Sequence, residues 1–480
     1  MRAQPLLAPV QSLFAVDLDE SLLRTDILLE KCVKLVRQFP LMIFCIPFQM
    51  LRGKLAFKKW IHEKVQLDYA TLPVRKAVLE KIEQARARGE RTLLISASLQ
   101  EDVSKVGEVI PLFDELVGSS DVNLRGTKKL AYLEQNYSHL TLTYLGNAFS
   151  DLKIWKGAQK IIAINPSALL NWRISSMNRA TEYIYDQNQL LVEIVRELRV
   201  YQWVKNFLVF LPVFAAHKFI DFHPWFKSIQ AFLGFSFLAS SVYVFNDICD
   251  LPSDRKQLSK KDRPLASGKV NLRTALLLVP FCLLLSFMTS WGLGQKTLVT
   301  MGCYLIMNVL YSFWVKKMLV LDVVFLAGFY TLRIFVGGTA SDTLVSEWLL
   351  SFAVFFFFGL AMVKRFSELK LQSSSSIGRF AGGRAYEVQD QMTVLISGVS
   401  TSILSILILA LYLSTGEVQH LYRNPRFLWL VTPCLLYWIN RMWILGARGK
   451  VTEDPLVFAL TDKVTWGVGL AVFFIVLWAI

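Results

Sequence analysis

An aspartate-rich segment near the middle of the chain carries the residues best suited to chemistry. Asn246, Asp247, Asp250 and Asp254 follow a long apolar stretch. If a helix continues through them, a rotation of about 100° per residue places all four within an arc of about 100°, so their oxygens converge. Carboxylates this close repel one another, and Mg²⁺ would relieve that repulsion while holding phosphate oxygens. The segment therefore predicts a magnesium site for a phosphorylated substrate, with Asp247 and Asp250 as catalytic residues.

The alternative is a solvated acidic helix end, balanced by the basic residues next to it in the chain. These are Arg255, Lys256, Lys260, Lys261 and Arg263. Ionisable clusters at membrane depth are by default functional, so the catalytic interpretation is favoured.

A second acidic pair, Asp17 and Asp19, comes directly after the apolar residues 14–16. Carboxylates two residues apart at the end of a strand point the same way. One can attack a phosphorus atom while the other handles the proton of the leaving group. Acidic loops are common at strand ends, so the pair alone is weak evidence for a catalytic site and needs support from residues later in the chain. Ser96 comes after another apolar run, Lys129 opens a helix-like stretch, and Asp151 ends the segment 144–151.

The first 190 residues have the pattern of a soluble α/β domain. Short apolar runs at 13–16, 92–95, 141–145 and 161–164 alternate with polar, helix-like stretches. This alternation predicts a parallel sheet with helices on its faces. The apolar segment 39–51 is too short to cross a bilayer and lies between basic residues. It is either a cap helix on the membrane surface or an ordinary buried helix.

From residue 191 to 480 the pattern changes to apolar blocks of about twenty residues, the length that crosses a bilayer. Nine predicted spans lie at 203–219, 226–247, 273–293, 297–314, 319–339, 347–366, 392–414, 427–446 and 464–480. The fold class is therefore multidomain, with an α/β domain preceding an all-α membrane bundle. The chain's hydrophobic content of 54% agrees with this division.

The distribution of charge predicts the orientation of this integral, multi-pass protein in the inner or plasma membrane. Loops after even-numbered spans are basic, at 255–263, 316–317, 364–384 and 441–450. Because basic loops face the cytoplasm, the N-terminal domain should be cytoplasmic. The net charge of +15 is explained by these loops and does not indicate nucleic-acid binding. The six cysteines form no pair typical of a disulfide framework or zinc site. Pro5, Pro9 and Gln11 interrupt the N-terminal apolar stretch, so no signal peptide is expected.

The pattern NDxxDxxxDR, with Lys260, Arg263-Pro264 and Ser267-Gly268 after it, resembles the first signature of the UbiA prenyltransferase superfamily. Trp203, Lys205 and Asn206 at the head of the first span also resemble it. The resemblance covers about residues 199–480. It implies nine helices around a cavity, Mg²⁺ with a diphosphate at the aspartate motif, and a lipid tail between helices.

Within the superfamily, the details are similar to decaprenyl-phosphate phosphoribosyltransferases. The residues concerned are Trp348, Lys364, Arg365, Glu368, Arg384, Tyr386 and 453–455. Enzymes with aromatic acceptors usually have a second aspartate-rich motif near the end of the sixth span, where this chain has Lys364, Arg365 and Glu368. One departure is Gln257-Leu258, where this branch commonly has His-Pro.

The resemblance implies phosphoribosyl pyrophosphate as donor and a polyprenyl phosphate as acceptor. The expected substrate-binding residues are Lys205, Asn206, Arg255, Lys260, Arg263, Lys364, Arg365, Glu368, Arg384 and Tyr386. Three alternatives remain open. The chain could transfer a polyprenyl group from its diphosphate to an aromatic acceptor, it could be a non-enzymatic transporter or scaffold, and Lys364 and Arg365 could only anchor a membrane-facing loop.

The ordered set in the N-terminal domain resembles the haloacid dehalogenase superfamily of phosphatases, over residues 11–170. The resemblance implies a Rossmann-like fold with Asp17 as nucleophile, Asp19 as general acid, and Ser96 and Lys129 as phosphate holders. Asp17 and Asp151 would bind Mg²⁺. Asn147 stands where the family usually has an aspartate. Together the two resemblances predict consecutive steps, in which the phosphatase removes the 5-phosphate from the product of the membrane domain.

Overall fold

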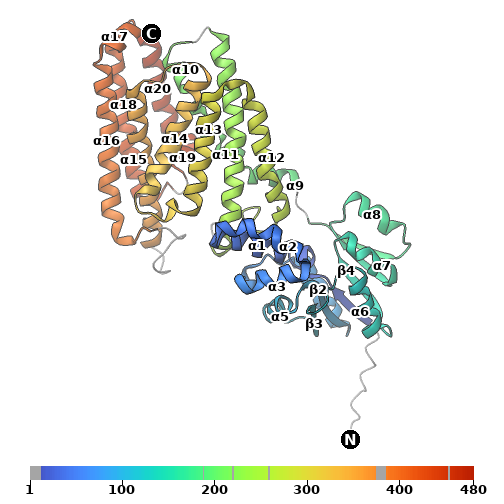
Figure 1. The fold of residues 1–480 in the computed structure, drawn as a ribbon. Coiled ribbons are helices and arrows are strands. Elements are labelled where there is room, and N and C mark those ends of the chain that lie inside the picture. The colour runs from blue at the N-terminus through green and yellow to red at the C-terminus, as the bar shows by residue number, and fades with distance from the viewer. Residues whose placement is uncertain (1–11, 187–188, 219–220, 258–259, 374–384, 452–453) are drawn as a thin grey trace. The chain divides into compact units, whose positions relative to one another are not determined.

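The computed structural model describes residues 12–186, 189–218, 221–257, 260–373, 385–451 and 454–480 (Figure 1). The chain divides into two compact units. The N-terminal unit comprises Met1–Glu197 and Phe245–Leu277, and the helical unit comprises Leu198–Val244 and Leu278–Ile480. The aspartate motif therefore packs with the N-terminal unit, although it lies on a membrane helix.

A parallel six-stranded sheet forms the centre of the N-terminal unit. Its strands are β1 (Ser12–Val16), β2 (Arg91–Leu99), β3 (Glu115–Ser119), β4 (Thr141–Gly146), β5 (Lys160–Ile164) and β6 (Ala180–Ile184). Their order is β3-β2-β1-β4-β5-β6, and every pair is parallel. This confirms the predicted parallel α/β sheet. The chain leaves β1 toward β2 on one side and returns to β4 on the other, so the crevice at the carboxyl end of β1 is where such sheets bind ligands.

Helices cover both faces of this sheet. One face packs against α4 (Lys76–Ala87) and α5 (Gln100–Val109). The other packs against α6 (Thr127–Tyr137), α7 (Leu152–Gly157) and α8 (Ala168–Ser175). In β1, Phe14 and Val16 belong to the first face and Leu13 and Ala15 to the second. Because successive side chains of a strand point to opposite faces, a strand covered on both sides is apolar throughout, which explains the predicted apolar runs.

A small cap is inserted after β1. It consists of α1 (Ile27–Gln38), η2 (Pro40–Phe44), α2 (Cys45–Leu51) and α3 (Lys54–Lys64). Leu35, Phe57, Ile61 and Val65 form its own core. No residue of η2 or α2 is buried, so the interpretation of 39–51 as an ordinary buried helix is wrong.

The helical unit contains a helical segment at each of the nine predicted spans. These segments include η5 (Val200–Phe210) with α10 (Leu211–Ala215), α11 (Phe222–Lys256), α12 (Leu272–Ser290), α13 (Gln295–Phe313), α14 (Leu321–Ala340), α15 (Glu347–Ser373), α16 (Gln391–Leu413), α18 (Val431–Ala447), and α19 (Pro455–Thr461) with α20 (Lys463–Ala479). Among the described residues, six helices are long and apolar enough to cross a membrane, or seven if α19 and α20, bent by 88°, form one span. The all-helical membrane bundle is thus confirmed, while the count of nine spans stays a prediction.

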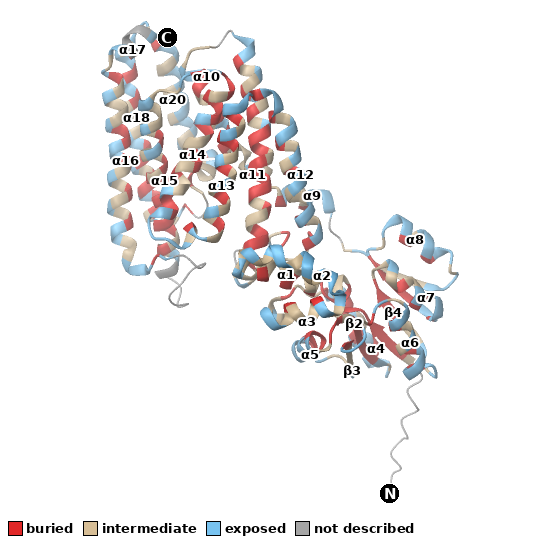
Figure 2. Cartoon of the chain, in the orientation of Figure 1, coloured by how far each residue is buried: buried red, intermediate tan, exposed pale blue. Residues whose placement is uncertain are grey.

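The most apolar span indicates that the helical unit lies in a lipid bilayer. The most apolar stretch of 18 residues in the helix at Val388–Leu413 has a mean hydropathy of 2.4, yet only 28% of it is buried inside the protein. Ile396, Leu407 and Leu411 are exposed on it, and Figure 2 shows how much of α16 is exposed. So large an apolar surface is rare on a water-soluble protein.

Candidate functional site

The carboxyl end of β1 brings together a carboxylate and an ammonium group that are far apart in sequence. Lys129 Nζ, buried at the start of α6, donates to Asp17 Oδ1 at 2.6 Å and to the Tyr144 hydroxyl at 3.0 Å. Burial alone would lower the pKa of Lys129, but the charges of Asp17 and Asp151 outweigh it and raise that pKa. Lys129 therefore stays cationic beside Asp17, as a phosphate-binding residue must.

Asp19 lies in the same crevice but in a different electrostatic environment. Its Oδ2 accepts from Ser98 Oγ at 2.6 Å and from Ser96 Oγ at 3.2 Å, and its Oδ1 accepts from the Ile27 amide at 2.9 Å. Burial, together with the charge of Asp26, raises the pKa of Asp19 to about 7. A carboxyl group that retains its proton near neutral pH can act as a general acid.

Asp151 completes this group. Its Oδ2 accepts from the amides of Asn147 and Ala148 at 3.1 and 3.0 Å. Burial and the charge of Asp17 raise the pKa of Asp151 to about 6. Ser21 Oγ donates to Asp17 Oδ2 and to Asn147 Oδ1, both at 3.2 Å.

The structure thus gathers all five predicted residues of the N-terminal domain: Asp17, Asp19, Ser96, Lys129 and Asp151. Asp17 and Asp151 are buried carboxylates that repel each other, and with the Asn147 amide oxygen they form the kind of oxygen donor set that Mg²⁺ prefers. Within the described ranges, however, no group of three or more His, Cys, Asp or Glu residues is arranged to hold a metal ion.

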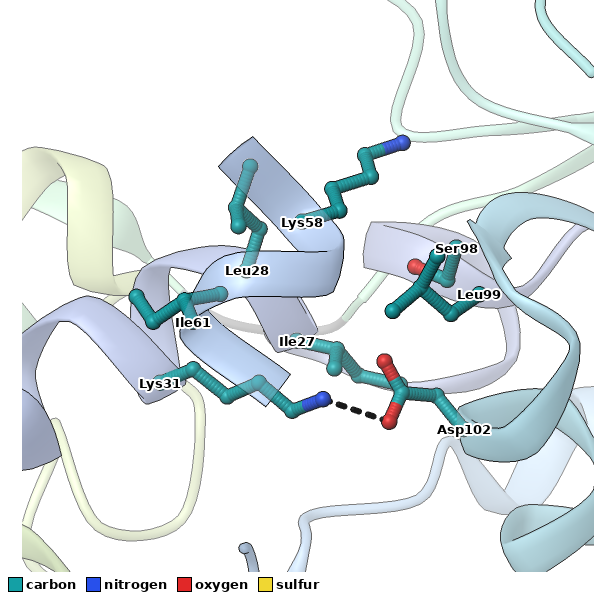
Figure 3. Close-up of a pocket in the computed structure, with 8 residues that line it drawn as sticks. All are labelled: Ile27, Leu28, Lys31, Lys58, Ile61, Ser98, Leu99 and Asp102. Atoms are coloured by element: carbon teal, nitrogen blue, oxygen red, sulfur yellow. Dashed lines mark hydrogen bonds and ion pairs between the residues drawn. The ribbon is translucent and has the colours of Figure 1, made fainter. Parts of the chain in front are cut away.

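A small pocket lies between the cap and the sheet (Figure 3), and Ser98 in its lining donates to Asp19. It is lined by Ile27, Leu28, Lys31, Lys58, Ile61, Ser98, Leu99 and Asp102. Lys31 Nζ is neutralised by Asp102 Oδ1 at 2.6 Å, whereas Lys58 Nζ donates to neutral oxygens, the carbonyl of Ala97 at 2.5 Å and Asn123 Oδ1 at 3.2 Å. Burial lowers the pKa of Lys58. Because both of these partners are neutral, Lys58 can bind an anionic group of a substrate near Ser96.

The aspartate motif lies on the last turns of α11, which continues as a helix to Lys256. Arg263 Nη1 donates to Asp247 Oδ1 at 3.0 Å and to Asp254 Oδ2 at 2.6 Å. Lys260 Nζ lies 3.7 Å from Asp254 Oδ1. Asp250 Oδ1 instead lies 3.6 Å from Arg37 Nη2 of the cap. Asp247 and Asp254 therefore share one counter-ion while Asp250 has a different one, and the convergence of all four residues stays a prediction.

Arg255, predicted to bind substrate, has a protein partner. Its Nη2 donates to Glu30 Oε1 at 2.6 Å, with both side chains buried, and its Nε donates to the Ala266 carbonyl at 3.2 Å. Glu30 also accepts from Thr25 Oγ1 at 2.6 Å. This pair ties the cap to the segment after the motif, and a substrate role for Arg255 stays a prediction.

In the helical unit, two predicted cations converge on Asp454, which the sequence analysis named as part of the resemblance but not as a site residue. Lys205 Nζ donates to Asp454 Oδ2 at 2.9 Å, and Lys364 Nζ lies 3.9 Å from the same oxygen. The Tyr330 hydroxyl donates to Asp454 Oδ1 at 3.2 Å. The cluster carries one more positive than negative charge, which suits a phosphate ligand.

Asn206 and Arg333 form a second buried pair, with Arg333 Nε donating to Asn206 Oδ1 at 2.8 Å. Sequence reasoning missed Arg333, although an arginine within the apolar block 319–339 is itself a signal of function.

Arg365, Glu368 and Tyr386 also lie together, around Asp322, a carboxylate that the sequence analysis did not select. Arg365 Nε donates to Asp322 Oδ2 at 2.8 Å, its Nη1 donates to Glu368 Oε2 at 2.8 Å, and the Tyr386 hydroxyl donates to Asp322 Oδ1 at 2.9 Å. Arg365 is only 1% exposed. It is therefore packed inside the bundle and does not anchor a loop at the membrane surface. Arg384 and Glu453 lie outside the described residues.

Comparison of the sequence with known proteins finds matches over most of the chain and over parts of it. Residues 207–464 match the UbiA prenyltransferase family. A relative in Sinorhizobium fredii, named Uncharacterized protein y4nM, is 30% identical over 456 residues, which is 94% of this chain and 88% of the relative. Nodulation protein NoeC of Azorhizobium caulinodans is 30% identical over 271 residues, 55% of this chain and 85% of that protein.

The decaprenyl-phosphate phosphoribosyltransferase of Mycolicibacterium smegmatis is 31% identical over 188 residues, 38% of this chain and 58% of that enzyme. Among solved structures, a UbiA homolog from Archaeoglobus fulgidus bound to GPP and Mg²⁺ matches with a TM-score of 0.44 and 16% identity, over 60% of this chain and 98% of that one.

Proposed function

The chain belongs to the UbiA prenyltransferase family and is a membrane transferase, and we propose that it transfers phosphoribose from phosphoribosyl pyrophosphate to a polyprenyl phosphate. The observation that carries this choice is the cluster of Lys205, Lys364 and Asp454, where two ammonium groups face one carboxylate. Its excess positive charge suits a phosphorylated substrate. The similarity to decaprenyl-phosphate phosphoribosyltransferases, 31% over 188 residues, supports the same choice.

The reaction exchanges one bond for another at C1 of the ribose. The bond from C1 to the pyrophosphate oxygen breaks, and a phosphate oxygen of the lipid forms the new bond to C1, so the protein needs no nucleophile. Lys205 and Lys364 would hold phosphate oxygens and stabilise the negative charge that develops as the bond breaks. In the N-terminal unit, Asn246, Asp247, Asp250 and Asp254 would hold Mg²⁺, which would supply positive charge to neutralise a diphosphate.

The crevice around Asp17 favours a second activity, the hydrolysis of a phosphate monoester. An oxygen of Asp17 would attack the phosphorus, with Ser96 and Lys129 holding the phosphate oxygens. The ester P–O bond breaks, and Asp19 gives its proton to the leaving alcohol oxygen. Water then releases phosphate from Asp17, with Asp19 taking the proton. The support is the pairing of Lys129 with Asp17 beside an acid, Asp19, whose pKa is raised to about 7.

Joined in one chain, the two activities would act in sequence. The transferase makes a polyprenyl-phosphoryl phosphoribose, and the phosphatase removes its 5-phosphate. Fusion raises the effective concentration of the intermediate at the second site.

Substrate choice is tested with the purified full chain in lipid nanodiscs. One reaction contains labelled phosphoribosyl pyrophosphate with polyprenyl phosphate, and the other contains labelled polyprenyl diphosphate with hydroxybenzoate. We expect a labelled lipid product only in the first. Asp247→Ala and Asp250→Ala should abolish it, whereas Asp121→Ala, at an exposed position of the N-terminal unit, should not. Product only in the second reaction would establish aromatic prenyl transfer, and product in neither would favour a scaffold or transporter.

The phosphatase is tested by measuring the lipid product and inorganic phosphate together. Wild-type protein should release phosphate and leave a dephosphorylated lipid, and Asp17→Asn should accumulate the phosphorylated lipid. A phosphorylated end product from wild-type protein would contradict the second activity and leave the transferase assignment intact.

A further inference from the structure

The cap carries an apolar surface that nothing in the described chain covers. Its large apolar side chains at positions 39, 41, 43, 44, 48, 50 and 51 are all exposed. Leu41 is 80% exposed, Phe48 71% and Leu51 86%. So dense an exposed apolar surface in water is characteristic of a docking site.

The charged residues that flank this apolar segment in the sequence are all basic. Lys34 and Arg37 precede it, Arg52, Lys54 and Lys59 come after it, and the sequence contains no acidic residue between Glu30 and Glu63. An exposed apolar segment flanked in the chain only by cations matches the lipid–water interface of a bilayer with anionic headgroups.

Contacts inside the N-terminal unit hold residues 39–51 near the lipid–water interface. Arg37, two residues before the segment, lies 3.6 Å from Asp250 near the end of α11. Glu30 of the same cap helix pairs with Arg255 at 2.6 Å. Asp26, which caps that helix, pairs with Arg273 at the start of α12 at 2.7 Å. Both α11 and α12 are long and apolar enough to cross a membrane. Helix α1 is thus fixed against the points where two membrane helices end.

We propose that residues 39–51 form an interfacial membrane anchor, inserted among the headgroups and upper acyl chains of a bilayer that contains anionic lipid. The apolar side chains of η2 and α2 enter the lipid, and Arg52, Lys54 and Lys59 bind phosphate headgroups. The anchor joins α1 to α3, which line the pocket beside Asp19. If the proposed phosphatase is correct, this arrangement makes its substrate a phosphate ester carried by a lipid, presented without leaving the membrane.

The test uses the full chain in liposomes, with an environment-sensitive fluorophore on a single introduced cysteine. The exposed native cysteines, Cys45 and Cys303, are first replaced by serine. The probe is placed by Phe48→Cys, and the matched control is Trp172→Cys, an aromatic residue 63% exposed in α8 of the same unit. We expect blue-shifted emission and quenching by spin-labelled acyl chains at position 48 only. Replacing part of the phosphatidylcholine with phosphatidylglycerol should strengthen the quenching at this position.

Two further measurements distinguish insertion into lipid from contact between two protein copies. Lys54→Glu combined with Lys59→Glu, both at exposed positions, should remove the effect of phosphatidylglycerol without changing transferase activity. Equal, weak quenching at positions 48 and 172 would overturn the proposal. So would shielding of position 48 that depends on protein concentration in detergent, because that result indicates contact between two copies. If position 48 is quenched by lipid but the protein releases no phosphate, the proposed phosphatase is wrong and the membrane anchor is still supported.

Discussion

A single nitrogen of Arg263, Nη1, donates to both Asp247 and Asp254, at 3.0 and 2.6 Å. Hydrogen bonds between ionised groups are short and strong, so this guanidinium offsets one of the two negative charges that Asp247 and Asp254 bring to the predicted metal site. A divalent cation bound to the same two oxygens would have to displace Arg263. Once displaced, Arg263 could bind the phosphate oxygens of the substrate that the metal ion holds.

Arg263→Gln should therefore lower the Mg²⁺ concentration that gives half-maximal transfer, by about tenfold. The physical reason is that the Arg263 guanidinium and Mg²⁺ are both positive, and two like charges at about 4 Å repel by several kcal/mol at a protein surface. Removing about 1.4 kcal/mol of this repulsion would strengthen Mg²⁺ binding by a factor of about ten. The maximal rate should fall, because a cation for the substrate is lost. The measurement is a Mg²⁺ titration of transferase activity, with Lys261→Gln, at an exposed position, as control. An unchanged or higher Mg²⁺ requirement would show that Arg263 does not compete with the metal.

Asn147→Asp should strengthen Mg²⁺ binding at the phosphatase site and raise the rate of phosphate release at low Mg²⁺. Asn147 Oδ1 and Asp17 Oδ2 accept from the same hydroxyl of Ser21, so both oxygens face one place. A carboxylate there adds the charge that an amide lacks. The variant should also be less stable without metal, because the new charge lies near Asp17 and Asp151. Phosphate release is compared across Mg²⁺ concentrations with Asn136→Asp, at an exposed position on α6. Equal Mg²⁺ dependence in both variants would place the metal elsewhere.

The parts of the structure that sequence could predict are those set by local pattern. The apolar runs of β1, β2, β4 and β5 identified a parallel sheet, and the carboxyl ends of such strands meet at one edge, so Asp17 and Ser96 could be expected together. The contacts of Asp454 with Lys205 and of Asp322 with Arg365 join different helices. They depend on how each helix is rotated about its axis, which periodicity does not specify. The first predicted span shows a further limit, because it is divided between η5 and α10.

Asp454→Asn should reduce kcat/KM for the transferase at least tenfold. Without this carboxylate, Lys205 and Lys364 face each other as uncompensated cations in the bundle and lose their positions. Breaking an ion pair by removing one member leaves a buried charge, which is strongly unfavourable. The control is Asp462→Asn, which removes another carboxylate of the same unit, paired with Arg441 at 2.6 Å. It should keep kcat/KM within about twofold in the labelled-donor assay. Equal losses in both variants would indicate a general structural effect.

Asp186→Asn should destabilise the N-terminal unit at neutral pH and much less in acid. Burial alone would raise the pKa of Asp186, but hydrogen bonds from Arg75 and Asn165 and the charge of Arg24 lower it. Because this carboxyl has a lower pKa in the folded state than in the unfolded chain, its contribution to stability is present above the ordinary carboxyl pKa of about 4. That contribution is lost as the pH falls through the lowered value. At pH 7 the cost should be about 2 kcal/mol, less than for a fully buried pair. Proteolysis of the unit in urea, in the full chain at pH 7 and at about pH 2, below the lowered pKa, measures the difference against Asp121→Asn. A difference that does not shrink in acid would mean that the negative charge of Asp186 does not stabilise the fold.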